Sequence, residues 1–247
     1  MDLSDYRKRP SEQERIGDLI NMLPDGGETA LDIGARDGYI SVLLADKFAR
    51  VTALDLEQPQ IDHPGVTCVK GNITAMDFPA ASFDLVFCAE VLEHIPPDLL
   101  AQACKELARV SRGHLLIGVP YRQDMRVGRT TCNSCGKNNP PWGHVNSFDD
   151  RKLARLFPGL RIVKKSFVGS SRDQTNALSS ALLDYAGNPF GTYQQDESCV
   201  HCGLAIGTPK ARSILQKIAT KLAYVICSAQ KPFIKAHPQW IHLLLGK

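Results

Sequence analysis

The sequence predicts an α/β fold: a three-layer sandwich in which helices cover both faces of a mostly parallel, doubly wound, seven-stranded sheet. Short runs rich in Val, Ile, Leu and Phe recur along the 247 residues, as expected of strands buried on both faces. Segments with apolar residues at helical spacing separate most of these runs, and such alternation is typical of a parallel sheet. The length suffices for one hydrophobic core and one elaboration of it.

The elements follow in order from the N-terminus. Ser11 and Glu14 make a capping box, which predicts a helix that ends at the Pro-Asp-Gly-Gly of residues 24–27. Further helices are predicted where apolar side chains recur every three or four positions, over residues 39–48, 96–111 and 149–157. The seven predicted strands cover residues 29–34, 50–56, 65–71, 82–90, 113–121, 159–169 and 238–247.

A long insertion separates the last two strands, so the core is predicted to comprise residues 1–170 and 238–247 and the insertion residues 171–237. The insertion is expected to contain one helix near residues 174–187 and another over 209–229. An apolar stripe along the second helix more often packs on its own domain, but a basic amphipathic helix also binds anionic membranes, so peripheral membrane contact stays open. The stripe consists of Ala211, Ile214, Leu215, Ile218, Leu222, Val225 and Ile226.

Composition and charge disfavour several classes of protein. The net charge of +3 is too small to indicate a nucleic-acid groove, so a nucleic-acid partner is disfavoured. The first 15 residues lack the apolar run of a signal peptide, and no stretch approaches the roughly 20 apolar residues of a membrane span. We therefore expect a soluble, cytoplasmic protein without a transmembrane segment.

A turn with two glycines joins the first predicted strand to the helix after it. A dinucleotide fingerprint, G-x-G-x-x-G, that starts at Gly34 would need a second glycine where this chain has Arg36. Asp32 and Asp37 also place negative charge near the helix N-terminus, where a pyrophosphate requires bare amides. The pattern disfavours NAD or FAD and favours a ligand that carries an ammonium and a sulfonium.

Five motifs occur in order over roughly residues 10–170. Residues 32–38 read Asp-Ile-Gly-Ala-Arg-Asp-Gly, and Asp55 ends the second strand 21 residues after Gly34. The others are "KGNITAMDF" from Lys70, "SFDLVFCAEVLEHIP" from Ser82 and "LARVSRGHLLIGVP" from Leu107. This series resembles the class I S-adenosylmethionine-dependent methyltransferases, whose first motif is D/E-x-G-x-G-x-G. The chain departs from that motif at the middle glycine, which is replaced by Arg36.

The resemblance implies S-adenosyl-L-methionine as cofactor and assigns its binding residues. Gly34 and Gly38 would let the loop approach the cofactor, Asp32 would lie near its methionyl end, and Asp55 would hold the ribose. Asn72 stands where the family more often has Asp, and its amide oxygen would accept a hydrogen bond from the adenine amine. The full set is Asp32, Gly34, Ala35, Arg36, Gly38, Asp55, Leu56, Asn72, Ile73, Ala89 and Glu90.

Two C-x-x-C-G segments, at Cys132/Cys135 and Cys199/Cys202, resemble zinc knuckles separated by 63 residues. Four thiolates fill a tetrahedral ion, so we expect a structural zinc that pins the insertion over the carboxyl edge of the sheet. Two disulfides, free thiols or a redox dithiol are the alternatives, and His144 or His201 could replace one cysteine. The remaining cysteines are expected to be small buried hydrophobes: Cys68, Cys88, Cys104 and Cys227.

The tetrapeptide Asn139-Pro140-Pro141-Trp142 matches a motif that amino-methyltransferases place after their fourth strand. Here it comes one strand later, so we interpret it as a stiffened loop. His144 is the candidate general base, since a neutral imidazole suits an alcohol or phenol acceptor, although a structural histidine is the commoner alternative. Weaker candidates near the acceptor are His94, Tyr121 and Asp124.

Three functions are compatible with these patterns. The first is a methyltransferase that acts on an oxygen or nitrogen of a small molecule, such as a sugar, a glycan or a secondary metabolite. The second is an RNA or protein methyltransferase whose zinc knuckles grip the partner, and the third is a non-catalytic subunit that binds S-adenosylmethionine. We favour the first, because the insertion segment before Cys199 is acidic or neutral and lacks a basic aromatic face.

Overall fold

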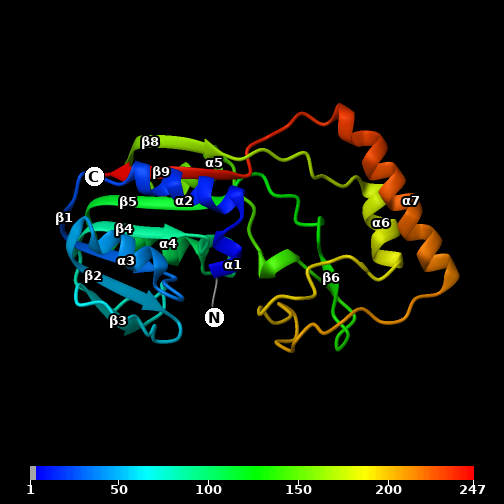
Figure 1. Cartoon of the computed structure of the whole chain (residues 1–247), viewed down its shortest axis with the longest axis horizontal. Coiled ribbons are helices and arrows are strands. Elements are labelled where there is room, and N and C mark those ends of the chain that lie inside the picture. Colours follow the sequence, from blue (N-terminus) through cyan, green and yellow to red (C-terminus); the bar gives the residue numbers. More distant parts are fainter. Residues whose placement is uncertain (1–3) are drawn as a thin grey trace. The chain divides into compact units, whose positions relative to one another are not determined.

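The structure is a computed structural model that describes residues 4–247, and it contains two compact units. The core unit comprises the chain up to Tyr121, Phe148–Gly169 and Pro238–Lys247 (Figure 1). The insertion unit comprises Arg122–Ser147 and Ser170–His237. Residues 122–147, which the sequence analysis grouped with the core, thus belong to the insertion unit. The reason is that they carry the first C-x-x-C pair, which lies next to the second.

The core unit contains the predicted seven-stranded sheet, in the order β3-β2-β1-β4-β5-β9-β8. Neighbouring strands from β3 to β5 are parallel, whereas β9 pairs antiparallel with both β5 and β8. The prediction of a mostly parallel sheet is therefore confirmed. The strands are β1 (Gly27–Ile33), β2 (Phe48–Asp55), β3 (Val66–Lys70), β4 (Phe83–Ala89), β5 (Ser111–Pro120), β8 (Arg161–Val168) and β9 (Trp240–Gly246).

Helices cover both faces of this sheet, which confirms the three layers. On one face, Leu19 of α2 and Leu44 of α3 belong to the same buried cluster as Leu116 of β5. On the other, Leu107 of α4 and Leu153 of α5 belong to the same buried cluster as Leu115, the neighbour of Leu116 on β5. Alternate residues of β5 thus enter opposite layers, as a strand requires. The core helices are α1 (Ser4–Arg7), α2 (Pro10–Met22), α3 (Tyr39–Ala45), α4 (Leu100–Val110) and α5 (Asp150–Arg155).

The start of α2 differs from the prediction. The helix begins at Pro10, with Arg9 at the N-cap position and no side-chain cap, so the capping box expected at Ser11 and Glu14 does not form. Proline favours the first helical position because its ring presets φ and it has no N–H group to leave unpaired. Pro10, one residue before Ser11, therefore determines where the helix begins.

The insertion unit contains a short hairpin and two helices that pack on each other. Capping boxes begin both helices: Asn176 with Ser179, and Ser213 with Gln216. The second helix, predicted from residue 209, consequently starts at residue 214. The elements are β6 (Thr130–Thr131), β7 (Asn138–Asn139), η2 (Pro141–Gly143), α6 (Ala177–Tyr185), α7 (Ile214–Gln230) and η3 (Lys231–Phe233).

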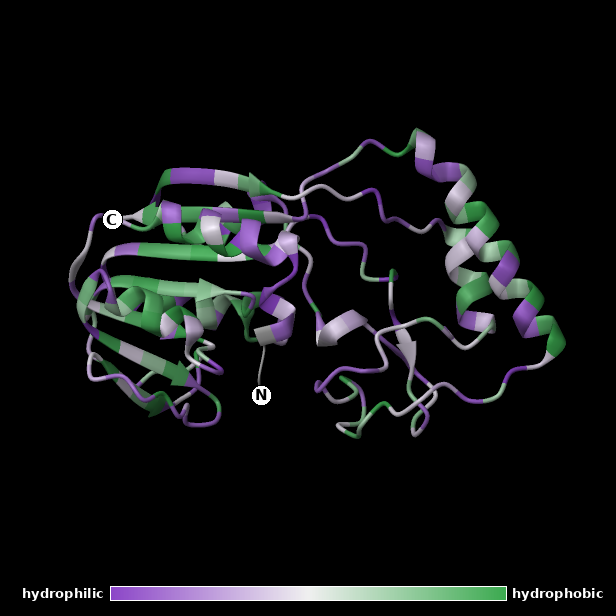
Figure 2. Cartoon of the chain, in the orientation of Figure 1, coloured by the Kyte–Doolittle hydropathy of each residue, from purple (hydrophilic) through white to green (hydrophobic). Residues whose placement is uncertain are grey.

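Hydropathy differs between the sheet strands and the insertion helices. Strands such as β4 and β5 are largely apolar, whereas apolar and polar residues alternate along α7 (Figure 2). No helix within residues 4–247 is both long and apolar enough to cross a membrane. Of the four single cysteines, Cys88 and Cys104 are buried as predicted, but Cys68 and Cys227 are only half-buried.

Candidate functional site

The strand order of the core sheet reverses direction between β1 and β4, and ligands of open α/β sheets bind outside the carboxyl ends of the strands at such a point. Ile33 near the end of β1 is in register with Leu54 of β2 and with Cys88 of β4. The residues that follow these three strands are therefore neighbours. The structure brings together the glycine turn after β1, Asp55 at the end of β2, and Ala89 at the end of β4.

Both glycines of the turn are required by its conformation. Gly34 has a φ of +75°, and a Cβ there would lie 2.6 Å from a methyl carbon of Val91. Gly38 has a φ of +78°, and its Cβ would lie 2.3 Å from the side chain of Ile61. The Gly34 amide donates to the carbonyl oxygen of Leu54 at 2.8 Å, which ties the turn to β2. Only glycine satisfies these backbone angles and close approaches at low cost.

Arg36, at the position where the methyltransferase motif has its middle glycine, also adopts a left-handed conformation, with a φ of +46°. A non-glycine residue in this region costs about 1 kcal/mol or more. Arg36 nevertheless adopts the left-handed conformation, so the turn keeps its shape despite the substitution. The Arg36 amide donates to Asp55 Oδ2 at 2.9 Å, and the Leu56 amide donates to Asp55 Oδ1 at 2.7 Å. A carboxylate has about four acceptor sites, so Asp55 keeps capacity for ligand hydroxyls while it holds the turn.

Asp32 is the buried acid of this turn. Its Oδ2 accepts a hydrogen bond from Ser41 Oγ of α3 at 2.6 Å. Burial, together with the nearby charge of Asp55, raises the pKa of Asp32 to about 7 against the opposing effect of the Ser41 hydroxyl. A cation next to this group favours the carboxylate over the neutral acid. The pair of acids therefore makes this edge of the sheet suited to a positively charged ligand.

Asn72 and Ile73 follow β3. Asn72 Oδ1 accepts hydrogen bonds from both the amide and the hydroxyl of Thr74, each at 2.9 Å. An amide oxygen has two lone pairs, so the oxygen expected to receive the adenine amine is already engaged. Ile73 is buried in the core, whereas Leu56, which follows β2, is mostly exposed. The apolar surface that this edge offers a ligand therefore comes from Leu56 rather than from Ile73.

Two glutamates follow β4, and burial raises the pKa of both carboxyl groups above the ordinary value. Glu90 has a φ of +57°, and its Oε2 accepts a hydrogen bond from Trp240 Nε1 at 3.3 Å. Glu93 lies in η1 (Leu92–His94), and neither of its carboxyl oxygens has a hydrogen-bond partner in the described part of the chain. Burial, and then the charge of Glu90, raise the pKa of Glu93 well above its ordinary value. This environment therefore disfavours the charged form of Glu93.

A polar network that was not predicted from the sequence joins the N-terminal helices to this edge. Arg15 donates to Glu12 Oε2 through Nε and Nη2, at 2.9 and 2.7 Å, and the Tyr6 hydroxyl donates to Glu12 Oε1 at 2.7 Å. Arg15 also lies 3.9 Å from Glu90. The i,i+3 spacing of Glu12 and Arg15 was visible in the sequence, but the long-range contact with Glu90 was not.

The four cysteines of the insertion unit form one cluster. Their sulfur atoms all lie within 4.8 Å of one another, and Sγ of Cys132 lies 3.7 Å from that of Cys202, as does Sγ of Cys135 from that of Cys199. Zinc–sulfur bonds of about 2.3 Å in a tetrahedron place sulfurs about 3.8 Å apart, whereas a disulfide requires about 2.05 Å. The donor set and its spacing fit a tetrahedral zinc ion.

The two C-x-x-C segments have the same backbone. The amide of Gly136 donates to the carbonyl of Cys132 at 2.9 Å, and that of Gly203 to Cys199 at 2.8 Å. Both glycines have a φ of +71°, which explains their place after each pair. The amide of Cys135, together with that of Ser134, lowers the pKa of the Cys132 thiol to about 6. The turn therefore stabilises the thiolate, the form that binds metal.

The Asn139–Trp142 segment lies beside this cluster. The buried Asn139 accepts a hydrogen bond from the Val200 amide at 2.8 Å and so joins the hairpin to the second C-x-x-C segment. Such a partner fits the interpretation of a structural loop. His201 Nε2 lies 2.9 Å from the carbonyl oxygen of Asn138, and the thiol cluster does not include it.

The other candidates near the acceptor also lie partly in the insertion unit. His144 is buried there, with Nδ1 2.7 Å from Gln123 Oε1. Asp124 accepts hydrogen bonds from Arg126 and from the Thr175 amide and hydroxyl. Asp124 is thus held within the insertion unit by two partners, which is the pattern of a structural carboxylate.

Residues 31–117 match a family of sequences described as "Methyltransferase domain". The segment is thus similar to methyltransferase domains. It runs from β1 into β5 and includes every residue that was predicted to bind the cofactor.

Two curated relatives illustrate the likeness. A "Probable S-adenosylmethionine-dependent methyltransferase" of Mycolicibacterium smegmatis is 34% identical over 112 residues, which cover 42% of this chain and 43% of the relative. A ubiquinone biosynthesis O-methyltransferase of Paracidovorax citrulli is 31% identical over 107 residues, covering 38% of this chain and 45% of the relative. The chain thus spans less than half the length of either protein.

The fold extends the likeness beyond the matched segment. The crystal structure of an S-adenosylmethionine-dependent methyltransferase from Mesorhizobium loti aligns with a TM-score of 0.52 at 14% identity, covering 94% of this chain and 96% of that one. At this identity the likeness concerns the fold, which is the Rossmann-like α/β sandwich predicted from the sequence.

Proposed function

We propose that the chain transfers a methyl group from S-adenosylmethionine to an oxygen or nitrogen atom of a small molecule. The observation that carries this proposal is the glycine turn, with the carboxyl groups of Asp32 and Asp55 beside it, inside the matched domain. The O-methyltransferases of ubiquinone biosynthesis among the relatives support a small-molecule acceptor. A sugar, a glycan or a secondary metabolite fits that class.

The proposed roles follow from the contacts of each residue. Asp55, whose oxygens face the turn, would accept from the ribose hydroxyls, and Asp32 would lie near the ammonium of the methionyl end. Exposed Leu56 would cover one face of the adenine. Asn72 Oδ1 already accepts two hydrogen bonds from Thr74, so backbone groups around residues 71–73 would bind the adenine amine instead. The backbone of Gly34, Ala35, Arg36 and Gly38 would form the floor, and that of Ala89 and Glu90 the side towards the acceptor.

S-adenosylmethionine supplies an electrophilic methyl group on a sulfonium, so the protein has mainly to orient the acceptor and exclude water. His144 is the proposed general base for a hydroxyl acceptor. The amide oxygen of Gln123 lies beside Nδ1 of His144 and can only accept a hydrogen bond. The His144 tautomer therefore carries its hydrogen on Nδ1 and its lone pair on Nε2. That is the form of imidazole that can accept a proton.

The four thiolates would hold one zinc ion in a structural role. Four sulfur ligands complete the coordination, so no position is left for water or substrate. Metal analysis of the purified protein is expected to find about one zinc per chain. Folded protein that contains no metal would contradict this part of the proposal.

Calorimetry of S-adenosylmethionine binding tests the cofactor site. Asp55→Asn removes the charge that grips the ribose and is expected to weaken binding by about tenfold to a hundredfold, as for loss of a charged hydrogen bond. Glu57→Gln is the matched control, since it makes the same chemical change on an exposed neighbour and leaves affinity unchanged. Equal affinities of the Asp55 variant and the wild type would overturn the assignment.

Turnover distinguishes the remaining functions. Release of S-adenosylhomocysteine with a panel of hydroxyl and amino acceptors supports a small-molecule enzyme, and His144→Asn should slow hydroxyl acceptors more than amines. Binding without turnover on any acceptor would instead favour a non-catalytic subunit. Retention on RNA that weakens steeply with salt would favour a macromolecular substrate.

A further inference from the structure

Helix α7 of the insertion unit carries its large apolar side chains on the side that faces solvent. Ile214 is 76% exposed and Val225 is 63% exposed, as large a fraction as for many charged residues. The buried positions of the helix are small or polar instead: Ala219, Thr220 and Ala223. This is the reverse of the amphipathic arrangement in which a surface helix packs its large apolar face inward.

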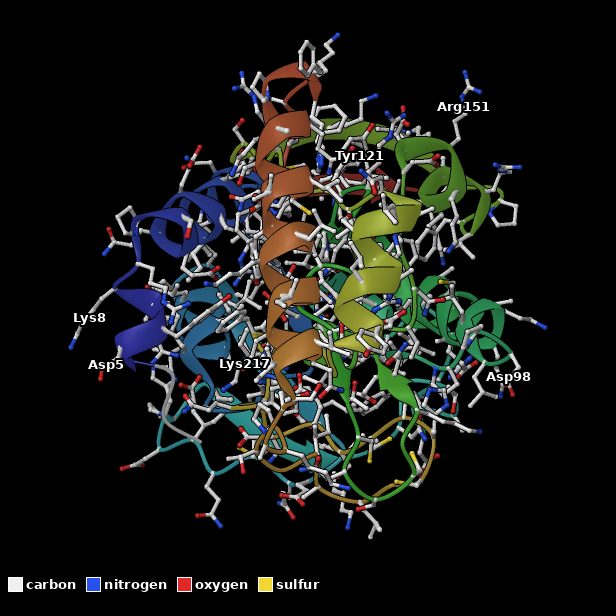
Figure 3. The ribbon with its side chains drawn as sticks, turned by 90° about the vertical axis from the view of Figure 1, so that its right-hand side faces the viewer. Asp5, Lys8, Asp98, Tyr121, Arg151 and Lys217 are labelled. Atoms are coloured by element: carbon white, nitrogen blue, oxygen red, sulfur yellow. The ribbon has the colours of Figure 1, made fainter. Side chains whose placement is uncertain are left out.

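The exposed residues form one continuous stripe. At 100° per residue, Ile214, Leu215, Ile218, Leu222 and Val225 fall within an arc of about 100°, along a helix about 25 Å long. The buried face, which packs on α6, is centred well away from that arc. The two helices lie side by side, and Lys217 is labelled beside α7 in Figure 3. The packing within the insertion unit therefore leaves the stripe uncovered.

Positive charge flanks one edge of this stripe and both ends of the helix. The segment 209–237 contains six Lys or Arg residues and no Asp or Glu. Lys217 and Lys221 fall next to the edge of the stripe on the helical wheel, close enough for their long side chains to extend from an apolar surface towards phosphate groups. Phe233, directly after the helix, is 90% exposed and adds an aromatic group of the kind found at membrane interfaces.

We propose that α7 binds the surface of a membrane that contains anionic lipid, with its apolar stripe among the acyl chains and Lys217 and Lys221 on the headgroups. The helix has 17 residues, and no described helix can cross a bilayer, so α7 lies in the plane of the interface. A second copy of the chain is a poorer occupant, because a symmetric contact would bring two strongly basic segments together. The proposal is independent of the methyl-transfer reaction.

Flotation of the full-length, zinc-containing protein with lipid vesicles tests the proposal. Binding is expected to vesicles of phosphatidylcholine and phosphatidylserine, and to be at least tenfold weaker without phosphatidylserine. Lys217→Gln and Lys221→Gln should each weaken binding about fivefold, since a lysine at an anionic surface contributes about 1 kcal/mol. Leu222→Gln should weaken it about tenfold, through the loss of one buried apolar side chain.

Matched variants separate this surface from general effects. Ile162→Gln on β8 changes an apolar residue that is 47% exposed, against 48% for Leu222, and Lys105→Gln removes an exposed cation from α4. Both should bind vesicles as the wild type does. Zinc content and S-adenosylmethionine affinity should stay unchanged in every variant, which shows that each is folded.

Three results would overturn the proposal. The first is absence of vesicle binding, which would mean that something other than lipid covers the stripe. The second is equal binding to neutral and anionic vesicles, or an equal loss in the control variants. The third is a dimer in sedimentation without lipid that Leu222→Gln dissociates, which would identify a second copy as the occupant.

Discussion

The core unit and the insertion unit are stabilised in different ways. The core buries two large clusters of hydrophobic side chains, one on each face of the sheet. The hydrophobic cluster of the insertion unit comprises Cys132, Cys199 and Ile206, with Tyr193 packed against it. Because burial of apolar surface is the main driving force for folding, hydrophobic burial stabilises the insertion unit less than the core unit. In the proposed function, metal coordination by the four cysteines takes the place of a hydrophobic core there.

The two units also present chemistry differently. In the core, the turn after β1 holds acids in place through backbone conformation and backbone hydrogen bonds. In the insertion, two identical backbone turns each present two thiols to a common centre. We therefore expect the cofactor site to stay folded after loss of the metal, whereas the insertion unit should unfold. Perturbing each unit separately tests this.

The largest effect is expected from removal of zinc. Cys132→Ser, or chelation, should abolish zinc binding and unfold the insertion, because structural zinc sites contribute about 10–16 kcal/mol in small peptides. Limited proteolysis should then cleave within residues 122–147 and 170–237 while S-adenosylmethionine still binds. Cys227→Ser, outside the cluster on α7, is the matched control and should change neither property. Unaltered digestion after complete zinc removal would break the comparison.

The next effect concerns the pH dependence of the unliganded core. The folded pKa of Asp32, about 7, lies above its ordinary value of 3.8, so the folded protein binds more protons between these pH values. Stability should therefore fall as pH rises through this window and stay low above it, by at most about 4 kcal/mol. Urea unfolding of Asp32→Asn should show a flatter profile.

Asp46→Asn, at the exposed end of α3, provides the control for that profile. It makes the same substitution without burial and should keep the wild-type slope. If Asp32→Asn retained the full slope as well, the buried carboxyl would not be its source.

A smaller effect is expected from the backbone of the turn. Gly34→Ala forces a side chain into a left-handed conformation and against Val91, which should destabilise the core by about 2 kcal/mol and weaken cofactor binding. Gly17→Ala is the contrasting glycine, because it lies in α2 with nothing within 4 Å of its added Cβ. It should stabilise the protein by about 1 kcal/mol. Destabilisation of equal size at both glycines would contradict the geometry.

The smallest effect concerns a surface contact over the turn. Arg7 lies 2.6 Å from Asp37 and over the ring of Tyr39, with side-chain exposures of 21% and 22% for the ion pair. Arg7→Ala should cost about 1 kcal/mol in thermal unfolding, less at high salt. Lys8→Ala removes the ion pair between Lys8 and Asp5, which is of similar length but has side chains that are 74% and 93% exposed. This variant should have no measurable effect.

Much of the core could be predicted because its signals are local. The seven strands, the helices between them and the glycines at Gly34 and Gly38 follow from residue pattern and from backbone conformations that few residues adopt. The start of α2 at Pro10 was misplaced, because a proline and a capping box competed within two residues. The Tyr6–Glu12–Arg15 network could not be predicted in full, because its link to Glu90 joins residues 75 positions apart (90 − 15).

The sequence by itself determined the sandwich, the turn with its acids and the two cysteine pairs. Each depends on short-range features: alternating buried strands, positive φ at particular glycines, and two-residue spacers between thiols. The tertiary structure alone decided that residues 122–147 join the insertion, that the buried Glu93 carboxyl has no hydrogen-bond partner among residues 4–247, and that α7 turns its apolar stripe to solvent. A helical pattern states which side chains share a face, but only packing in three dimensions decides which face is covered.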